Sequence, residues 1–587
     1  MNHPRPAALL ASPIGRLLAE GASGNDADRL REIGGQLMAA IGEGHPCLAL
    51  DPADEADLAR LEAADPVTVL TDPGPEDDPG TPFILDRSGR AGPRLYLHRY
   101  FTYEQRLAAG LAALIRRRAP TDDRPDLVPL LAGLPDRAAA TARTVINAAL
   151  ADGLTLITGG PGTGKTSLVA SIFAALDKAV GHGSAGQPLA IALAAPTGKA
   201  AARLGDALAA ADRRLPSGWR LAGEPATLRI EPPATLHRLL GIRPDSGRPR
   251  HGPERPLRHD LIVVDEASMV DLALMHDLLA AIDPARTRLI LLGDSDQLAS
   301  VEAGAVLADL ARPGEDRPWA AHVHQLTHNW RFRGGDSLGE LCAAIRSGRA
   351  DTALDLLADP DQPAVGLDAL PPRLSVNGLL DEGARDALRS LVEAATPAEA
   401  LAALDRHLLL CGTNTGPLGT YALNRLIATW AADRRGLAAG QPRFDGMPLL
   451  VTENAYGLGL FNGDRGVFFH DPEDPAGPLW AWFADPADPA RLRRFAPARL
   501  PAHLTAYALT VHRAQGSEAD RVTLVVPGDG ESPLPPTREW GYTAVSRARE
   551  TVRILGDRGS VEALINRPTE RISGLARRLT EALNQCS

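Results

Sequence analysis

Short apolar runs alternate with longer amphipathic stretches between residues 137 and 330. The runs predict buried strands, and the stretches between them repeat apolar side chains at helical spacing. Apolar strands separated by helices are typical of a parallel sheet with helices on both faces. The expected strands lie at 154–158, 189–195, 261–265 and 287–294, and helices are expected at 137–150, 198–211 and from Lys165 onward. This segment is therefore predicted to be an α/β domain.

A second set of buried strands predicts a second α/β domain, formed by residues 331–439 and 506–575. Its strands are expected at 407–411, 522–526 and 551–555. Between its two parts, residues 440–505 contain short β runs that are broken by Gly, Asp and Pro. We interpret residues 440–505 as a small inserted β-barrel of the SH3-like type.

The first 120 residues are interpreted as a helical N-terminal domain. Residues 95–118 carry apolar side chains at helical spacing and predict a packing helix, and a surface for docking a partner is the alternative. Residues 119–136 are rich in Pro and Asp and are interpreted as a linker. Residues 242–258 are basic and rich in turn residues, which predicts a hairpin or loop insertion.

Composition excludes several classes of protein. The chain has 587 residues, of which 44% are hydrophobic, and its net charge of −11 argues against coating nucleic acid by bulk charge. The four cysteines form no CxxC pair, so neither an iron–sulfur cluster nor a zinc knuckle is indicated. Neither a signal peptide nor an apolar run of about 18 residues is present, so we expect a cytoplasmic protein without a membrane span.

Lysine is rare in this chain. Of the 62 basic residues only three are lysine: Lys165, Lys178 and Lys199. This bias is typical of a GC-rich genome, in which a remaining lysine marks a position that needs a compact point charge. Two of the three lysines lie in motifs with candidate chemistry.

The stretch GGPGTGKTS lies between a predicted strand and a predicted helix, as a P-loop requires. Its backbone N–H groups can wrap phosphates, Lys165 can reach the β- and γ-phosphate oxygens, and the Thr166 hydroxyl can bind Mg²⁺. The predicted nucleotide-binding residues are Gly159, Gly160, Pro161, Gly162, Thr163, Gly164, Lys165, Thr166 and Ser167. ATP and Mg²⁺ are the expected ligands.

Polar residues at the ends of two further strands complete a candidate hydrolytic site. In LIVVDEAS, Asp265 can hold the Mg²⁺ shell and Glu266 can polarise the attacking water. In LLGDSDQLASV, Gln297 can contact both the γ-phosphate and that water. Arg331 and Arg547 are candidates for the positive charge that phosphoryl transfer needs in the transition state. The chain has no Asn-Lys-x-Asp guanine motif, so a G-protein is excluded.

A longer set of motifs resembles superfamily 1 helicases, and in its details the RecD family. The motifs are APTGKAAARL (195–204), TLHRLLG (235–241), VVDEASMVDL, LGDSDQLASV, NWRF, CGTNTGPLGTYALN (411–424), VTENAYGLGLFNGDRG (451–466), LTVHRAQGSE (509–518) and YTAVSRARE. The resemblance covers most of residues 140–575, and GHPCLAL and YLHRYFTYEQRLA extend it toward the N-terminus.

This resemblance implies a 5′→3′ ATP-dependent DNA helicase subunit that acts at double-strand ends with RecB-like and RecC-like subunits. It implies that the nuclease site lies in another subunit, and that both candidate arginines belong to the second domain and sense closure of the ATP cleft. The positions implied in contacting single-stranded DNA, or in linking it to ATP, are Thr197, Lys199, His237, Thr510 and His512. Gln515, Gly516 and Glu518 would form the loop that couples the ATP cleft to the DNA track.

One feature departs from the family pattern. Such helicases carry a glutamine about sixteen residues before the P-loop glycines that reads adenine, and residues 136–150 contain none. We therefore expect other nucleotides to be tolerated. A stand-alone RecD-like helicase, the helicase part of a conjugative relaxase and a structural subunit without motor activity remain as alternatives. The first 120 residues show no helix–hairpin–helix glycines, no relaxase-type His cluster precedes the P-loop, and the intact ATPase motifs argue against a structural subunit.

Overall fold

The computed structural model describes most of the chain. The described residues are 6–71, 80–89, 92–118, 124–179, 188–221, 227–243, 246–312, 317–332, 335–438, 440–485, 488–528 and 535–585. Within these ranges, no helix combines the length and apolar character needed to cross a membrane. Cys47, Cys342 and Cys411 are buried free thiols, and Cys586 lies outside the described residues.

The first α/β sheet has seven strands, all parallel, in the order β11-β5-β10-β9-β6-β7, with β8 also paired to β6. Its strands are β5 (Leu154–Thr158), β6 (Leu189–Ala195), β7 (Leu228–Ile230), β8 (Ala234–Thr235), β9 (Leu261–Val264), β10 (Arg288–Gly293) and β11 (Val323–Gln325). Its helices are α5 (Val128–Leu131), α6 (Asp136–Ala151), α7 (Lys165–Ala179), α8 (Gly198–Arg214), α9 (Leu236–Leu240), α10 (Leu272–Ala280) and α11 (Val306–Ala311). The α/β prediction is confirmed.

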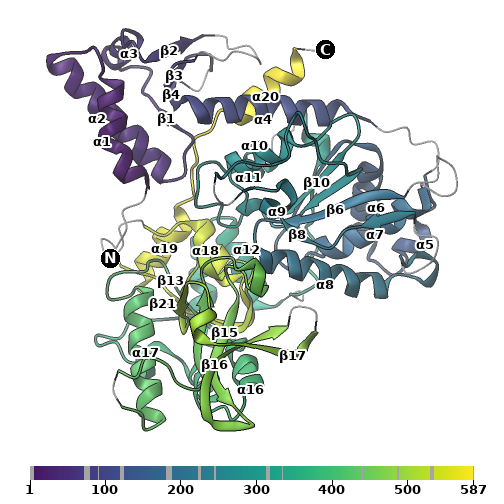
Figure 1. The fold of residues 1–587 in the computed structure, drawn as a ribbon, viewed down its shortest axis with the longest axis vertical. Coiled ribbons are helices and arrows are strands. Elements are labelled where there is room, and N and C mark those ends of the chain that lie inside the picture. Colours follow the sequence, from purple (N-terminus) through teal and green to yellow (C-terminus); the bar gives the residue numbers. More distant parts are fainter. Residues whose placement is uncertain are drawn as a thin grey trace.

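The second parallel sheet has the order β12-β21-β20-β13-β19. Its strands are β12 (Val365–Asp368), β13 (His407–Cys411), β19 (Ala508–Thr510), β20 (Ala519–Val525) and β21 (Ala548–Leu555). Its helices are α12 (Ser337–Arg346), α13 (Ala350–Ala358), α14 (Val376–Leu379), α15 (Glu382–Val392), α16 (Pro397–Leu404), α17 (Thr420–Arg434), α18 (Arg538–Val545) and α19 (Arg558–Asn566). Figure 1 shows the first sheet at the right of the molecule and the second at the lower left.

The inserted segment forms an antiparallel sheet in the order β17-β16-β15-β14-β18. Its strands are β14 (Met447–Val451), β15 (Arg465–Asp471), β16 (Asp474–Asp485), β17 (Asp488–Phe495) and β18 (His503–Thr505). The β character of this insertion agrees with the sequence. The pairings among the described residues leave β17 and β18 as the two edges, so closure into a barrel remains a prediction.

The basic insertion at 242–258 is a loop in its described part. Gly252 and Arg255 form an isolated antiparallel bridge, and residues 244 and 245 lie outside the described ranges. The expected linker at 119–136 contains the short helix α5, and its residues 119–123 lie outside the described ranges.

The N-terminal domain is not purely helical, so this part of the fold prediction is wrong. It combines α1 (Pro6–Leu18), α2 (Gly24–Gly42), α3 (Glu55–Glu62) and α4 (His98–Arg116) with β1 (Cys47–Ala49), β2 (Val67–Leu70), β3 (Phe83–Asp86) and β4 (Arg94–Leu97). The strands pair in the order β1-β4-β3-β2. They are only three or four residues long, too short to show a clear alternation of polar and apolar positions.

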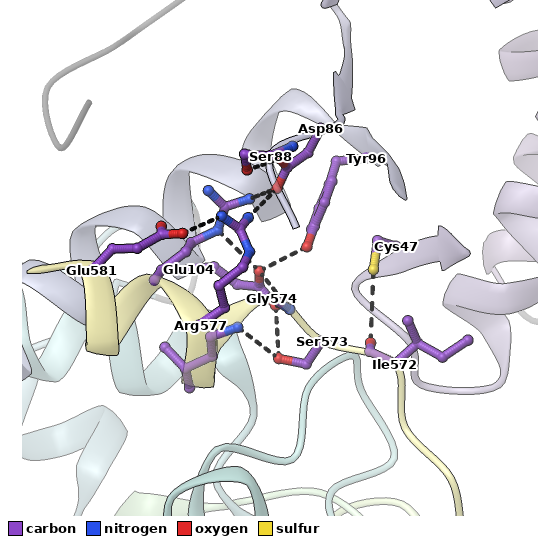
Figure 2. A network of polar contacts seen from close by, with 12 residues as sticks. Cys47, Asp86, Ser88, Tyr96, Glu104, Ile572, Ser573, Gly574, Arg577 and Glu581 are labelled. Carbon is purple, nitrogen blue, oxygen red and sulfur yellow. Dashed lines mark hydrogen bonds and ion pairs between the residues drawn. The ribbon is translucent and has the colours of Figure 1, made fainter. Parts of the chain in front are cut away.

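The C-terminal segment leaves the second sheet and packs on the N-terminal domain. After α19 the chain crosses to α20 (Leu575–Asn584), which lies beside α4 (Figure 1). Figure 2 shows the polar network that holds it there, in which buried Asp86 accepts hydrogen bonds from Arg577 and from Arg578, the latter at 2.7 Å. This segment therefore ties the second α/β domain to the N-terminal domain, which the expected domain boundary at 575 did not foresee.

Glu104 is the fully buried centre of this network, and we predict that Glu104→Gln lowers the free energy of unfolding by about 2 kcal/mol. Its carboxylate accepts from the Tyr96 hydroxyl, from Ser573 Oγ and from the backbone N–H of Gly574 at 2.9–3.1 Å. An amide places an NH₂ group against these donors and removes the charge that faces Arg578. Urea unfolding measures the change. Glu581→Gln, which removes only the half-exposed Arg577 pair, is the control and is expected to cost about 0.5 kcal/mol; equal losses would contradict the prediction.

Candidate nucleotide and nucleic-acid site

The P-loop runs from the end of β5 into α7. Gly162 and Gly164 have φ angles of 78° and 85°, the left-handed region that favours glycine. A Cβ atom at Gly162 would lie 2.5 Å from Arg331 Cβ, so this position also has no room for a side chain. Lys165 Nζ donates to the carbonyls of Gly159 and Gly160 at 2.5 and 3.2 Å, which places the ammonium over the loop. The loop thus fits a triphosphate, with backbone N–H groups and one lysine as donors.

The two carboxylates after β9 lie beside this loop. Burial, together with the adjacent Glu266 carboxylate, raises the pKa of Asp265, and the positive charge of Lys165 opposes this shift. Glu266 is the only non-glycine among the described residues with a positive φ, at 51°. Such a backbone conformation costs about 1–3 kcal/mol and is concentrated at functional sites. Asp265 and Glu266 therefore follow β9 as predicted, and the backbone is strained at Glu266.

Asp265, Glu266 and Thr166 carry oxygen atoms, the ligand type that a magnesium ion prefers. Among the described residues, no three His, Cys, Asp or Glu side chains gather in a way that could hold a metal. Mg²⁺ is commonly held by one or two protein oxygens together with substrate phosphates and waters. Asp265 and the Thr166 hydroxyl would provide such a partial ligand set, and the magnesium site remains a prediction.

The NWRF segment packs directly on the P-loop. Asn329 Nδ2 donates to the carbonyl of Pro161 at 3.0 Å, and Trp330 N donates to the carbonyl of Gly162 at 2.8 Å. Arg331 follows these residues on the loop that leaves β11, the edge strand of the first sheet. Arg331 thus lies at the domain boundary expected at 331: its neighbours Asn329 and Trp330 are bonded to the P-loop, and its guanidinium reaches Glu518 of the second domain.

Arg331 and Glu518 form the central ion pair between the two α/β domains. Arg331 Nη2 lies 2.6 Å from Glu518 Oε1. Burial opposes ionisation of Glu518, yet Arg331, with Arg547 and Arg203 nearby, lowers the pKa of Glu518. Arg547 is almost fully buried and donates from Nε to the carbonyl of Thr543 at 3.0 Å. Both predicted arginines thus lie in one cluster around a single carboxylate.

The LGDSDQ segment is hydrogen-bonded to the second domain at several points. Asp294 Oδ2 accepts from Gln297 Nε2 and from the Tyr542 hydroxyl, both at 3.0 Å. The backbone of Leu298 donates to Thr543 Oγ1 and accepts from Gln515 Nε2, both at 2.8 Å. Gln297 therefore belongs to the junction that joins strand β10 to helix α18.

Tyr542 is a site residue that the sequence did not single out. A Cβ atom at Gly160 would lie 2.7 Å from the Tyr542 hydroxyl, so this side chain from the second domain closes against the P-loop. It stands five residues before Arg547 in the quoted YTAVSRARE segment. Motif spacing alone did not indicate that the Tyr542 hydroxyl would bond to Asp294.

The predicted DNA residues divide into two groups. Thr197 Oγ1 accepts from Ala200 N and caps α8. Exposed His237 is the second residue of α9, which follows β8, the strand paired with β6. Thr510 ends β19, and His512 starts the next turn. Lys199 joins the groups, because its Nζ donates to Ser517 Oγ at 2.7 Å. Burial, with Arg203 and Arg465 nearby, lowers the pKa of Lys199 to about 7. DNA contact at these five positions remains a prediction.

A pocket of about 670 Å³ lies beside the P-loop and is lined in part by Gly164 and Ser167. Its walls come from α6, which presents Arg137, Thr141 and Ala142, and from His328 and Trp330. The two aromatic rings stand edge to face with centroids 4.3 Å apart, and Trp330 is 51% exposed. This is the zone where the family's adenine-reading glutamine was expected, and α6 presents no amide side chain there.

We predict that ATP and GTP are hydrolysed with KM values within about fivefold of each other. The exposed Trp330 can stack on any base, and stacking contributes about 1–3 kcal/mol whatever the base. Trp330→Ala is therefore expected to raise both KM values about tenfold. Trp319→Phe, at a buried tryptophan that does not line the pocket, serves as the control. Steady-state phosphate release with each nucleotide measures this. Strict use of ATP would contradict the prediction.

Comparisons with known proteins agree with this arrangement. Residues 138–363 match a model of an AAA domain, and residues 505–555 match a UvrD-like helicase C-terminal domain. The chain is 41% identical to the RecBCD enzyme subunit RecD of Mycolicibacterium smegmatis, over 92% of each chain. It is 30% identical to the ATP-dependent RecD2 DNA helicase of Deinococcus radiodurans, over 81% of this chain and 57% of that one.

A solved structure of two coordinating Pif1 helicases at forked double-stranded DNA matches with a TM-score of 0.40 and 17% identity, over 73% of this chain and 94% of that one. The family assignment rests instead on the sequence relatives, since the M. smegmatis protein matches along nearly its whole length. The chain belongs to the RecD family of RecBCD enzyme subunits.

Proposed function

We propose that this chain is the ATP-driven DNA helicase subunit of a RecBCD-type enzyme, moving 5′→3′ on single-stranded DNA at double-strand ends. The observation that carries the proposal is the segment 510–518. It starts at Thr510 beside α17 and continues to Gln515, Ser517 and Glu518, which bond to Leu298, Lys199 and Arg331 of the first domain. One short segment thus joins the proposed DNA-binding side to the nucleotide side.

The chemistry follows from the residues around the P-loop. The P-loop N–H groups and Lys165 bind the phosphates, and Arg331 and Arg547 supply positive charge where it develops during phosphoryl transfer. Glu266 orients and polarises the attacking water. A magnesium ion held by Thr166 and Asp265 would neutralise phosphate charge. Because Arg331 is bonded to Glu518, any change at the γ-phosphate reaches the second domain through this ion pair.

The proposed partners are RecB-like and RecC-like subunits, in the cytoplasm. Support comes from the relatives, whose names place them in RecBCD enzymes. The near-complete match to these subunits favours this assembly over a stand-alone helicase, since the chain covers 57% of the RecD2 relative. We further propose that the N-terminal domain and the inserted sheet take part in partner docking and in the DNA channel, respectively.

The test is unwinding of duplexes with a 5′ or a 3′ single-stranded tail, together with DNA-stimulated ATP hydrolysis, by the chain alone and with its partner subunits. Unwinding only from the 5′ tail is expected. Unwinding from the 3′ tail would overturn the polarity. No DNA-stimulated hydrolysis, alone or in the complex, would overturn the motor itself.

A further inference from the structure

Loop 294–305, which joins β10 to α11, contains neither helix nor strand along its length. It carries Gln297, a predicted site residue, and Val301 in its middle is 61% exposed. No ladder of backbone hydrogen bonds fixes such a loop, so contacts from neighbouring segments set its position. Those contacts therefore decide where the loop presents Gln297.

The loop is held at two places. Its first part is bonded to α18 of the second domain through Leu298, and its second part is bonded to Arg571. Nη2 of this arginine donates to the carbonyl of Ser300 at 2.6 Å, and Nη1 donates to the carbonyls of Gly304 at 3.0 Å and Glu302 at 3.3 Å. A planar guanidinium has donors in fixed directions, so one side chain can span all of these carbonyls. Arg571 therefore fixes the second part of the loop.

Arg571 also contacts the N-terminal domain. A Cβ atom at Gly44 would lie 2.8 Å from Arg571 Cζ, and the carbonyl of Gly44 accepts from the N–H of Gly304 at 2.9 Å. Burial lowers the pKa of Arg571, and the Asp309 carboxylate opposes this shift. Within the described part of the chain, the hydrogen bonds that Arg571 donates all end on main-chain carbonyls of the loop. Arg571 thus acts on the loop through directed hydrogen bonds.

The segment between α19 and α20 that carries Arg571 is itself anchored on both sides. The N–H of Thr569 donates to Glu539 in α18 at 2.6 Å, and the N–H of Ile572 donates to His45 Nδ1 of the N-terminal domain at 3.0 Å. The backbone of Arg571 is therefore held between the second domain and the N-terminal domain. From this fixed position its side chain reaches the first domain.

Arg571 and Gln297 line the same cavity, whose volume is about 490 Å³. Arg571 is only partly buried, and its Nε has no hydrogen-bond partner among the described residues. If the side chain is shortened, a small cation can enter from the cavity and reach the carbonyls of the loop. The site therefore allows a chemical test of what the guanidinium does.

We propose that Arg571 is a positioning residue for ATP hydrolysis, which holds loop 294–305 so that Gln297 stays in place for the γ-phosphate and the attacking water. The inference rests on the proposed motor function, in which Gln297 has this role. Arg571 lies outside every helicase motif quoted from the sequence. It acts through the loop, and the N-terminal domain supplies one wall of its seat.

The test is steady-state ATP hydrolysis by the full chain, alone or in the complex, at saturating single-stranded DNA. Arg571→Ala is expected to lower kcat about tenfold and to change the KM for ATP by no more than about twofold, because it disturbs the orientation of one group and removes no phosphate contact. Arg571→Lys should recover little, since an ammonium cannot span the loop carbonyls. Millimolar guanidinium chloride, compared with equal sodium chloride, should restore part of the kcat of Arg571→Ala.

A double-variant cycle with Gln297→Ala tests whether the effect passes through the loop. If it does, Arg571→Ala should lower kcat far less in the Gln297→Ala background than in the unaltered chain. Arg577→Ala is the matched control, because Arg577 lies in the following helix α20 and pairs with Asp86 and Glu581, outside the loop. It weakens the docking of the same C-terminal segment and should keep nearly full kcat.

Unchanged kcat in Arg571→Ala would overturn the positioning role alone. Equal losses in Arg571→Ala and Arg577→Ala without rescue by guanidinium would show that the segment only holds the domains together, and would also overturn it. If Arg571→Ala does not fold, Arg571→Lys takes its place, and full kcat in that variant would overturn the role. Absence of ATP hydrolysis by the unaltered chain, alone and in the complex, would overturn the proposed function together with the inference.

Discussion

Replacing Lys165 with glutamine is expected to reduce ATP hydrolysis about 1,000-fold, to near the limit of detection. The ammonium is held directly over the P-loop, through its bonds to the carbonyls of Gly159 and Gly160. A neutral amide cannot stabilise the negative charge that develops on the phosphate oxygens. Loss of one such preorganised group lowers the catalytic rate roughly 100- to 1,000-fold. Phosphate release at saturating single-stranded DNA measures the rate, and anisotropy with labelled DNA confirms that the variant still binds the strand.

The control is Lys178→Gln, because Lys178 lies on the same helix in its last turn. It removes an identical charge at the opposite end of α7, so it should keep nearly full activity. If both lysine variants lose activity equally, the effect is one of overall charge or folding, and the assignment of Lys165 to the phosphates is wrong.

The parallel sheets could be predicted from the sequence because their strands are long, apolar and followed by recognisable loops. The strands expected at 154–158, 189–195 and 407–411 coincide with β5, β6 and β13. A buried parallel strand needs apolar residues on both faces, so it is visible as a continuous run. The short strands β2 and β3 stand in a region rich in Asp and Pro, and their pairing is set by tertiary contacts that no local pattern records.

The site shows the same division between local and tertiary information. The P-loop, Asp265 and Glu266 are adjacent in sequence to the strands that place them, so their position followed from the motifs. The partners of Lys199 and Arg331 lie 318 and 187 residues further along the chain. A motif identifies a functional residue, but it does not show which residue of a distant loop will bond to that side chain. Tyr542 was missed for this reason.

The second large effect is expected for Arg331→Ala, which should slow ATP hydrolysis about 1,000-fold or more, within the range of 10³ to 10⁵ for loss of an arginine at a transferring phosphoryl group. Arg331 is fixed to the P-loop through its neighbours Asn329 and Trp330, so its guanidinium is already positioned. Arg331→Lys should recover little, because lysine lacks the planar fork that contacts a carboxylate and a phosphate together. Single-turnover hydrolysis separates this loss from ATP binding, which should fall much less.

Glu518→Gln decides between catalysis and structure, because it breaks the same ion pair and leaves the Arg331 guanidinium in place. If Arg331 acts on the phosphates, this variant keeps most of its DNA-free hydrolysis and loses chiefly the stimulation by single-stranded DNA, since the link to segment 510–518 is cut. If the ion pair only holds the domains together, Arg331→Ala and Glu518→Gln should be equally impaired in both rates. Equal impairment would therefore remove Arg331 from the catalytic residues and leave the ion pair as a structural contact between the two domains.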